Sequence, residues 1–110
     1  MRTFFDSYDL LLCPATIVPP FPVEQRYVAE CDGVKLDSYV DWLMIVHAIT
    51  LTASPAISIP CGFTADHLPV GLQIMAPPMA DDRLYLVGSA LEKALVDRWG
   101  HLLIEEAPEL

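Results

Sequence analysis

One cysteine and one histidine lie close enough in the sequence to suggest nucleophilic chemistry. Cys61 precedes a glycine and is followed six residues later by His67, and a thiol next to an imidazole is a common activated nucleophile. Such a pair also requires close approach of the two side chains and a third group that orients the histidine. Because buried cysteines usually serve as small hydrophobes, we interpret Cys61 as a packing residue. A cysteine-dependent hydrolase that uses Cys61 is kept as an alternative hypothesis.

The histidines favour structural roles over metal binding. A histidine on an otherwise apolar helix, as at His47, is more often a hydrogen-bonded core or pocket residue than a ligand. The histidines at positions 47, 67 and 101 lack the converging spacing that a metal site requires. The sequence therefore predicts no metal and no cofactor.

Two further pairs of residues also have structural interpretations. Asp81 and Asp82 could form an acid pair, but they suit the start of a helix, where negative charge is stabilising. Trp42 and Tyr39 could line a pocket, whereas core packing is the default for aromatic side chains of this size.

The elements that must position these residues form an α/β pattern: a partial mixed β-sheet with flanking helices, in the order strand, helix, strand, strand, helix. The predicted elements are a strand within 8–15, a proline-rich extended stretch from Thr16, a loop at 23–37, a helix from Ser38 to about Thr52, strands at 56–60 and 70–76, and a helix that opens at Asp81.

Local signals set these boundaries. Ser38 with Asp41 three residues later is a capping-box pattern, and the helix that follows is apolar almost all round, so we expect it to be buried on most sides. Asp66 and His67 supply the turn between the last two strands. In the final helix Gly100 is expected to act as a stop, and residues 104–110 are expected to form a frayed tail. One apolar stripe should face the sheet: Leu84, Val87, Leu91 and Leu95.

Charge and cysteine content exclude several classes of protein. The net charge is −9, with six Lys and Arg residues that never cluster, which argues against nucleic acid and anionic membranes as partners. The uncharged stretch 42–65 is interrupted by Pro55 and Pro60, so we interpret it as a buried helix and strand and not as a membrane span. Three cysteines without CxxC spacing favour a reducing cytoplasm over a disulfide framework.

The chain also carries more apolar surface than three strands can cover. Apolar residues make up 54% of the sequence, and contiguous apolar patches larger than a few hundred Å² normally mark an interaction site. We therefore expect a partner that covers this surface.

Four segments at characteristic spacing resemble the C-terminal portion of the amidase signature family. They are YDLLLCPAT (8–16), a buried helix ending in ITLTASPAISIPCGFT (49–64), LPVGLQIMAP (68–77) and a final helix. This family includes bacterial amidases, aryl acylamidases, fatty acid amide hydrolase and the amidotransferase subunit that makes Gln-tRNA. The resemblance covers residues 4–99, and it implies that 1–110 is the C-terminal portion of an amidase domain.

The resemblance implies carboxamide hydrolysis by a Ser–Ser–Lys triad with a glycine-rich oxyanion hole. In the family those residues precede the portion that matches this chain. The only Gly-Ser pair here is Gly88-Ser89, inside the predicted last helix, and the two lysines are Lys35 in the polar loop and Lys93 beside Asp97. No position inherits a catalytic role, so we predict no catalytic residue.

What the resemblance does transfer is part of a substrate-channel wall. In some members the helix before SPAISIP lines the acyl channel, which by position places Val40, Leu43 and His47 on one helical face. The sequence departs from the family at Thr50, often Asn, and at Ala53, often Gly. His67 stands where glycine is usual, so it must adopt the turn conformation that glycine takes freely.

Two principal hypotheses follow. The first is a C-terminal amidase fragment, cytoplasmic and inactive alone, whose partner is the N-terminal amidase core. The second is a stand-alone, non-catalytic interaction module that self-associates through its apolar face.

Overall fold

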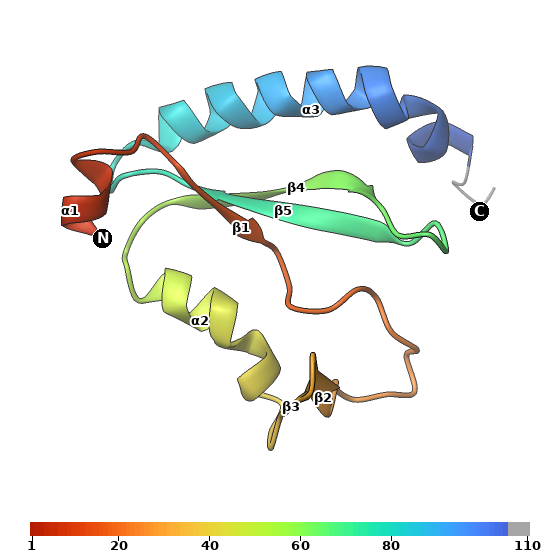
Figure 1. Ribbon diagram of the computed structural model, residues 1–110. Coiled ribbons are helices and arrows are strands. Elements are labelled where there is room, and N and C mark those ends of the chain that lie inside the picture. Colours follow the sequence, from red (N-terminus) through yellow and green to blue (C-terminus); the bar gives the residue numbers. More distant parts are fainter. Residues whose placement is uncertain (106–110) are drawn as a thin grey trace.

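The computed structural model of the chain describes the backbone of residues 1–105 and the side chains of residues 1–98. Its elements, in order, are α1 (Arg2–Phe5), β1 (Leu11–Pro14), β2 (Glu30–Cys31), β3 (Val34–Lys35), a 3₁₀ turn η1 (Asp41–Leu43), α2 (Met44–Thr50), β4 (Ala56–Phe63), β5 (Pro69–Met75) and α3 (Asp81–Glu105). The long helix α3 lies along one face of a three-stranded sheet, and α2 with the β2–β3 hairpin lies on the other side (Figure 1). The α/β class and the order of the five main elements are confirmed.

The main sheet has the strand order β1-β5-β4. Both strand pairs are antiparallel, with Ile74 of β5 opposite Leu12 on one side and Ile57 on the other. The expectation of a mixed sheet was therefore wrong: β1 and β4 run in the same direction, but β5 separates them. The predicted turn between β4 and β5 is confirmed, and His67 adopts the left-handed conformation there, with φ +61°.

The core lies between α3 and the sheet. Ile59, Ile74, Ala76 and Leu84 form its buried cluster, and the predicted stripe of α3 packs on it through Val87, Leu91 and Leu95. Gly88 is buried where α3 crosses β4, and a Cβ atom there would lie 3.3 Å from Cδ1 of Ile57. The Gly-Ser pair thus marks close helix–sheet packing.

The helix α2 differs from its prediction in both length and burial. Asp41 Oδ2 accepts hydrogen bonds from the backbone N–H groups of Asp37 and Ser38, each at 2.9 Å, which is half of the expected capping box. The chain then makes a 3₁₀ turn, so the α-helix begins at Met44 and not at Ser38. None of its residues is buried, because α2 packs mainly on η1 and not on the sheet.

Two other expectations were wrong. The predicted loop 23–37 contains the β2–β3 hairpin, in which Asp32 (φ +49°) and Gly33 (φ +76°) form the tight turn that an Asp-Gly pair favours. The helix α3 continues through position 100 to Glu105, because glycine lowers helix propensity without ending a helix. Of the expected frayed tail 104–110, the first two residues belong to α3 and residues 106–110 lie outside the described residues.

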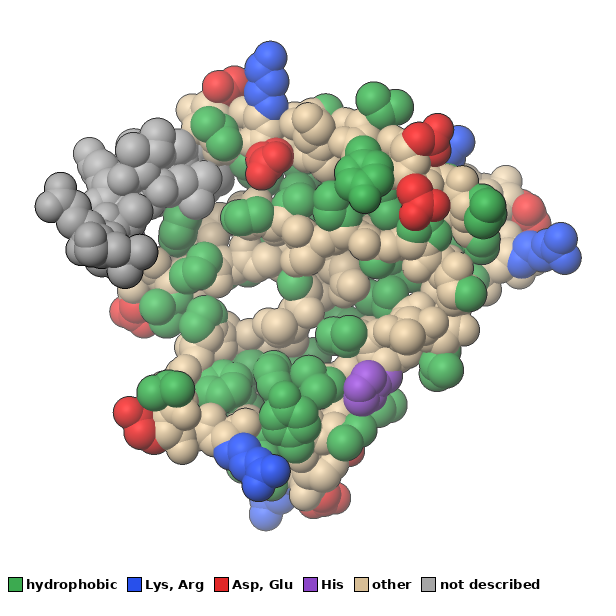
Figure 2. All heavy atoms as spheres, turned by 180° about the vertical axis from the view of Figure 1, so that it is seen from behind, with side chains coloured by type: hydrophobic (Ala, Val, Ile, Leu, Met, Phe, Trp, Pro, Cys, Tyr) green, Lys and Arg blue, Asp and Glu red, His purple; other side chains and the backbone are tan. Residues whose placement is uncertain are grey.

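The chain exposes more surface than a compact domain of its mass. Its accessible surface is 8150 Å², against about 6,100 Å² for a folded monomer of this size. The radius of gyration is 16.0 Å, against about 13 Å for a compact chain of this length. Figure 2 shows hydrophobic side chains on both sides of an opening between the upper and lower layers. Surface of this kind is typical of a segment that packs against further polypeptide.

No helix among the described residues is long and apolar enough to cross a membrane. The stretch 42–65 instead contains most of η1 and all of α2 and β4, in keeping with the predicted helix followed by a strand.

Ala53, which follows α2, provides a test of local strain. Its φ is +52°, a left-handed conformation that costs a residue with a Cβ roughly 1–2 kcal/mol. We expect Ala53→Gly to raise the free energy of unfolding by about 1 kcal/mol, measured by urea denaturation. The same change at the exposed helical position Ala90 is the matched control and should lower stability by about 1 kcal/mol. Equal changes in the free energy of unfolding at both positions would contradict backbone strain at Ala53.

Candidate functional site

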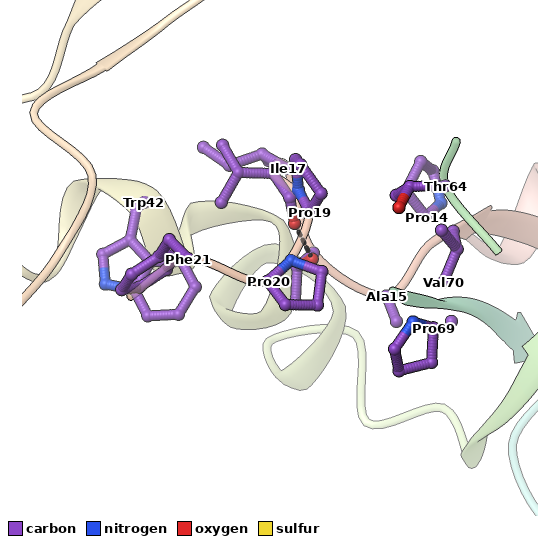
Figure 3. A pocket seen from close by; sticks show the side chains of 13 residues that line it. Pro14, Ala15, Ile17, Pro19, Pro20, Phe21, Trp42, Thr64, Pro69 and Val70 are labelled. Atoms are coloured by element: carbon purple, nitrogen blue, oxygen red, sulfur yellow. Dashed lines mark hydrogen bonds between the residues drawn. The ribbon is translucent and has the colours of Figure 1, made fainter. Parts of the chain in front are cut away.

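A cavity of about 610 Å³ lies where the chain leaves β1 and descends toward the lower layer. In Figure 3 the rings of Trp42 and Phe21 stand together at one end and Thr64, Pro69 and Val70 at the other, with the proline-rich segment between them. The volume falls within the range of small-molecule sites. The lining residues are Pro14, Ala15, Thr16, Ile17, Val18, Pro19, Pro20, Phe21, Trp42, Thr64, Pro69, Val70 and Gly71.

Proline content and three side-chain contacts shape the wall of this cavity. Proline rings fix φ and remove backbone donors, so the segment after β1 runs extended past the end of the sheet. The Thr16 hydroxyl donates to the Val18 carbonyl at 2.6 Å, and the Cys31 thiol of β2 donates to the Ile17 carbonyl at 3.4 Å. The ring of Phe21 packs edge-on against Trp42 at 5.6 Å between centroids. The wall is therefore attached to both the hairpin and η1.

The lining is apolar and holds no titratable side chain. Its polar side-chain groups are the hydroxyls of Thr16 and Thr64 and the indole N–H of Trp42, which is buried without a hydrogen-bond partner among the described residues. General acid–base catalysis needs a group that takes and returns a proton near neutral pH, and neither hydroxyl does so. The lining of the cavity is suited to enclose an apolar group.

The structure brings none of the three predicted wall residues into this cavity. Val40 and His47 are exposed, and Leu43 is half-buried. Their neighbour Trp42 does line the cavity, and Tyr39 packs edge-on against it at 5.8 Å. A substrate-facing role for Val40, Leu43 and His47 stays a prediction.

The proline-rich segment was predicted to be an extended stretch, but its place in the cavity wall was not predicted from the sequence. Three prolines within four residues, directly after a buried strand, predict a stiff extended stretch beside the end of a sheet. The spacing of Pro19, Pro20 and Pro22 was the available signal for that backbone conformation.

The other candidate residues remain apart. Cys61 lies on β4 beside a bulge in its pairing with β5, and His67 lies in the exposed turn; within the described part of the chain no hydrogen bond joins their side chains. Asp81 and Asp82 occupy the first turn of α3, as predicted. In the part of the chain with described side chains, no three His, Cys, Asp or Glu residues could together hold a metal ion.

All three cysteines, Cys13, Cys31 and Cys61, are free thiols. Burial raises the pKa of the Cys13 thiol above its ordinary value, because a thiolate loses hydration when it is desolvated. Cys13 therefore lacks the lowered pKa that marks a reactive cysteine.

Comparison with known proteins shows the family. A family model described as Amidase matches residues 1–85. The glutamyl-tRNA(Gln) amidotransferase A subunit of Streptomyces avermitilis is 44% identical over 107 residues, which cover 96% of this chain and 20% of that protein. The proteins of the same name from Cutibacterium acnes and Thermobifida fusca are 42% and 37% identical over 103 residues, which cover 93% of this chain. No solved structure matches the chain.

The chain therefore belongs to the amidase family, as the motifs of the sequence indicate. It spans about a fifth of the length of these relatives.

Proposed function

We propose that the chain is the C-terminal portion of an amidase that hydrolyses a carboxamide. In this proposal it contributes scaffold and an apolar binding wall, and a further polypeptide contributes the catalytic residues. The observation that carries the proposal is the placement of the serines and lysines, which the family's Ser–Ser–Lys chemistry would have to join by hydrogen bonds.

The two lysines lie in opposite layers of the molecule. Lys35 is on β3 in the lower layer and Lys93 is on α3 in the upper layer, and both are exposed (Figure 1). A lysine that acts as a base must be desolvated so that it is neutral. Among the described residues no lysine forms a hydrogen bond with a serine, which supports placing the triad of the proposed amidase in the further polypeptide.

The proposal assigns the apolar part of the substrate to the cavity between the proline-rich segment and Trp42. Apolar lining gives affinity for a hydrocarbon or aryl group, and the scissile amide would extend from the cavity toward the catalytic residues. Val40, Leu43 and His47 would line the same channel once further polypeptide encloses it. Because the relatives are named as subunits, an assembly with other chains is part of the proposal, in a reducing cytoplasm.

The purified chain should therefore be inactive. With a serine-reactive fluorophosphonate probe we expect no labelled serine, and with a chromogenic anilide we expect no turnover above the uncatalysed rate. The reason is that an unactivated serine hydroxyl is a weak nucleophile. A labelled serine mapped by mass spectrometry, or measurable hydrolysis, would show that the chain contains its own catalytic residues.

Self-association is the second candidate function, and the excess of exposed surface favours it. The difference of about 2,000 Å² from a compact monomer is larger than the area that one partner contributes to a standard interface, about 800 Å². Light scattering on the purified chain measures its mass directly. If the chain self-associates, its mass in solution should be at least twice 12.2 kDa. A stable monomer at high concentration would exclude self-association.

A further inference from the structure

Three polar side chains form a row across the sheet on the face turned away from α3. Cys13 of β1 and Ser58 of β4 lie directly opposite Gln73 of the central strand β5. Side chains alternate between the two faces of a strand, and Ile74 belongs to the core beneath α3. Gln73 and its two neighbours therefore point to the opposite side, toward the lower layer (Figure 1).

The row has unused hydrogen-bonding capacity. The Cys13 thiol lies 4.0 Å from Oε1 of Gln73, which is a weak contact, and no acceptor among the described residues pairs with the Gln73 amide donors. Ser58 is exposed on the other flank. A glutamine side chain carries two donors and one acceptor, and Gln73 is half-buried but is not among the buried side chains without a partner, so its amide donors are open to solvent. The row is therefore able to pair with another polar group.

The row adjoins the apolar cavity on the same face of the sheet. Gly71 precedes Gln73 by two residues, so it shares that face, and it lines the cavity together with Ala15. A Cβ atom on Gly71 would lie only 2.8 Å from Cβ of Ala15 and 3.3 Å from Oγ of Ser58. Because glycine has no side chain, no side chain of position 71 separates the cavity from Gln73.

We propose that Gln73, flanked by Cys13 and Ser58, binds the carboxamide group of a ligand whose apolar part fills the cavity. A carboxamide presents a donor and an acceptor side by side, which matches the amide of Gln73 in both respects. A carboxylate is bound most strongly by a cationic side chain, and neither this row nor the cavity lining contains one. The inference deepens the proposed function, on which it rests, by assigning the polar end of the substrate to these three residues.

The composition of the chain permits a direct test by nuclear magnetic resonance. The sequence contains two glutamines, Gln25 and Gln73, and no asparagine, so a ¹⁵N-labelled sample shows only two side-chain NH₂ pairs. The variant Gln25→Leu assigns them. Titration with benzamide should shift the Gln73 pair saturably and leave the Gln25 pair in place, because Gln25 lies outside the cavity and bonds to the Tyr27 carbonyl.

Two variants separate the polar row from the cavity. Gln73→Leu should weaken benzamide binding about tenfold, the loss expected for one or two hydrogen bonds, while Gln25→Leu should bind like the parent. N,N-dimethylbenzamide, which lacks the N–H donors, should bind the parent more weakly than benzamide. Because Ser58 is exposed, Ser58→Ala is the replacement variant if Gln73→Leu fails to fold. Ser58→Ala should weaken benzamide binding by a smaller factor than Gln73→Leu.

The outcomes distinguish this inference from the proposed function. Benzamide shifts confined to the Trp42 indole and the cavity residues, with the Gln73 pair unmoved, would overturn the inference and leave the amidase assignment intact. The absence of any benzamide-induced shift would also overturn it. Serine labelling of the chain alone would contradict the proposed function without bearing on the Gln73 signals.

Discussion

Replacing Gly71 with valine is expected to lower the free energy of unfolding by about 3 kcal/mol, the upper end of the usual range for overpacking. Gly71 lies on the central strand β5, where its carbonyl accepts a hydrogen bond from the Ala15 N–H at 3.0 Å. A Cβ atom there would lie 2.8 Å from the Ala15 Cβ, a distance that two carbon atoms do not tolerate. Valine adds two methyl groups to that clash, so β1 must move away from β5.

The matched control is Gly88→Ala on α3. There the nearest neighbour of the new Cβ would be Cδ1 of Ile57 at 3.3 Å, the end of a flexible side chain. Alanine also improves helix propensity by about 1 kcal/mol, which offsets the small adjustment of Ile57. Urea denaturation should therefore show a large loss for Gly71→Val and almost none for Gly88→Ala. Similar stabilities for the two variants would mean that β1 and β5 do not approach as closely as described.

The sequence was most informative where local pattern and tertiary packing agree. The strands β4 and β5 carry apolar alternation between prolines, and the stripe from Leu84 to Leu95 packs on the sheet as its spacing predicts. Asp81 and Asp82 mark the start of α3 because charge at a helix N-terminus acts locally. Such signals need no knowledge of the rest of the molecule.

Features that depend on pairing partners were not predicted. The direction of β1 relative to its neighbours is set by long-range register, which no local pattern specifies. The short hairpin β2–β3 was missed although Asp32-Gly33 is a strong hairpin signal, because its strands are only two residues long and lack apolar alternation. The sequence therefore predicted the individual elements better than the way in which the strands pair.

The apolar composition of α2 predicts burial that this chain does not provide. Met44 is 57% exposed and Leu51, just after the helix, is 87% exposed. Helices with apolar residues all round are normally covered on most sides. In the proposed amidase these side chains would be covered by further polypeptide, which would also enclose the cavity beside Trp42.

The same reasoning explains why the site was only partly predictable. Val40, Leu43 and His47 were predicted from the resemblance to the family together with their helical spacing, but η1 replaces the first turn of the expected helix, which changes their relative orientation. The cavity instead uses Trp42 and the segment after β1, which meet only in three dimensions. Sequence spacing could identify the proline-rich segment but not its partner across the cavity.

The largest expected change in kcat/KM concerns a relative of full length from which the segment matching this chain is removed and then replaced by this chain. In the Streptomyces avermitilis amidotransferase subunit, removal of the matching 20% should lower kcat/KM of the amidotransferase reaction by roughly 10³-fold or more, because even small displacements of positioning groups cost about 10²-fold. Insertion of this chain in that place should restore the value to within about tenfold, since the packing residues of the sheet and α3 are supplied again.

Two controls accompany the chimera. The chimera carrying Gly71→Val should lose most of the restored activity, because its β1 and β5 cannot approach. The chimera carrying Gly88→Ala should retain it. Circular dichroism of all the variants separates a loss of activity from a loss of folding.

The measurement that tests the central claim is therefore the kcat/KM of the chimera beside that of the isolated chain. We predict that the chimera retains the amidotransferase activity of the relative, and that the isolated chain does not hydrolyse amides. A folded chimera without activity, or amide hydrolysis by the 110-residue chain alone, would contradict the claim.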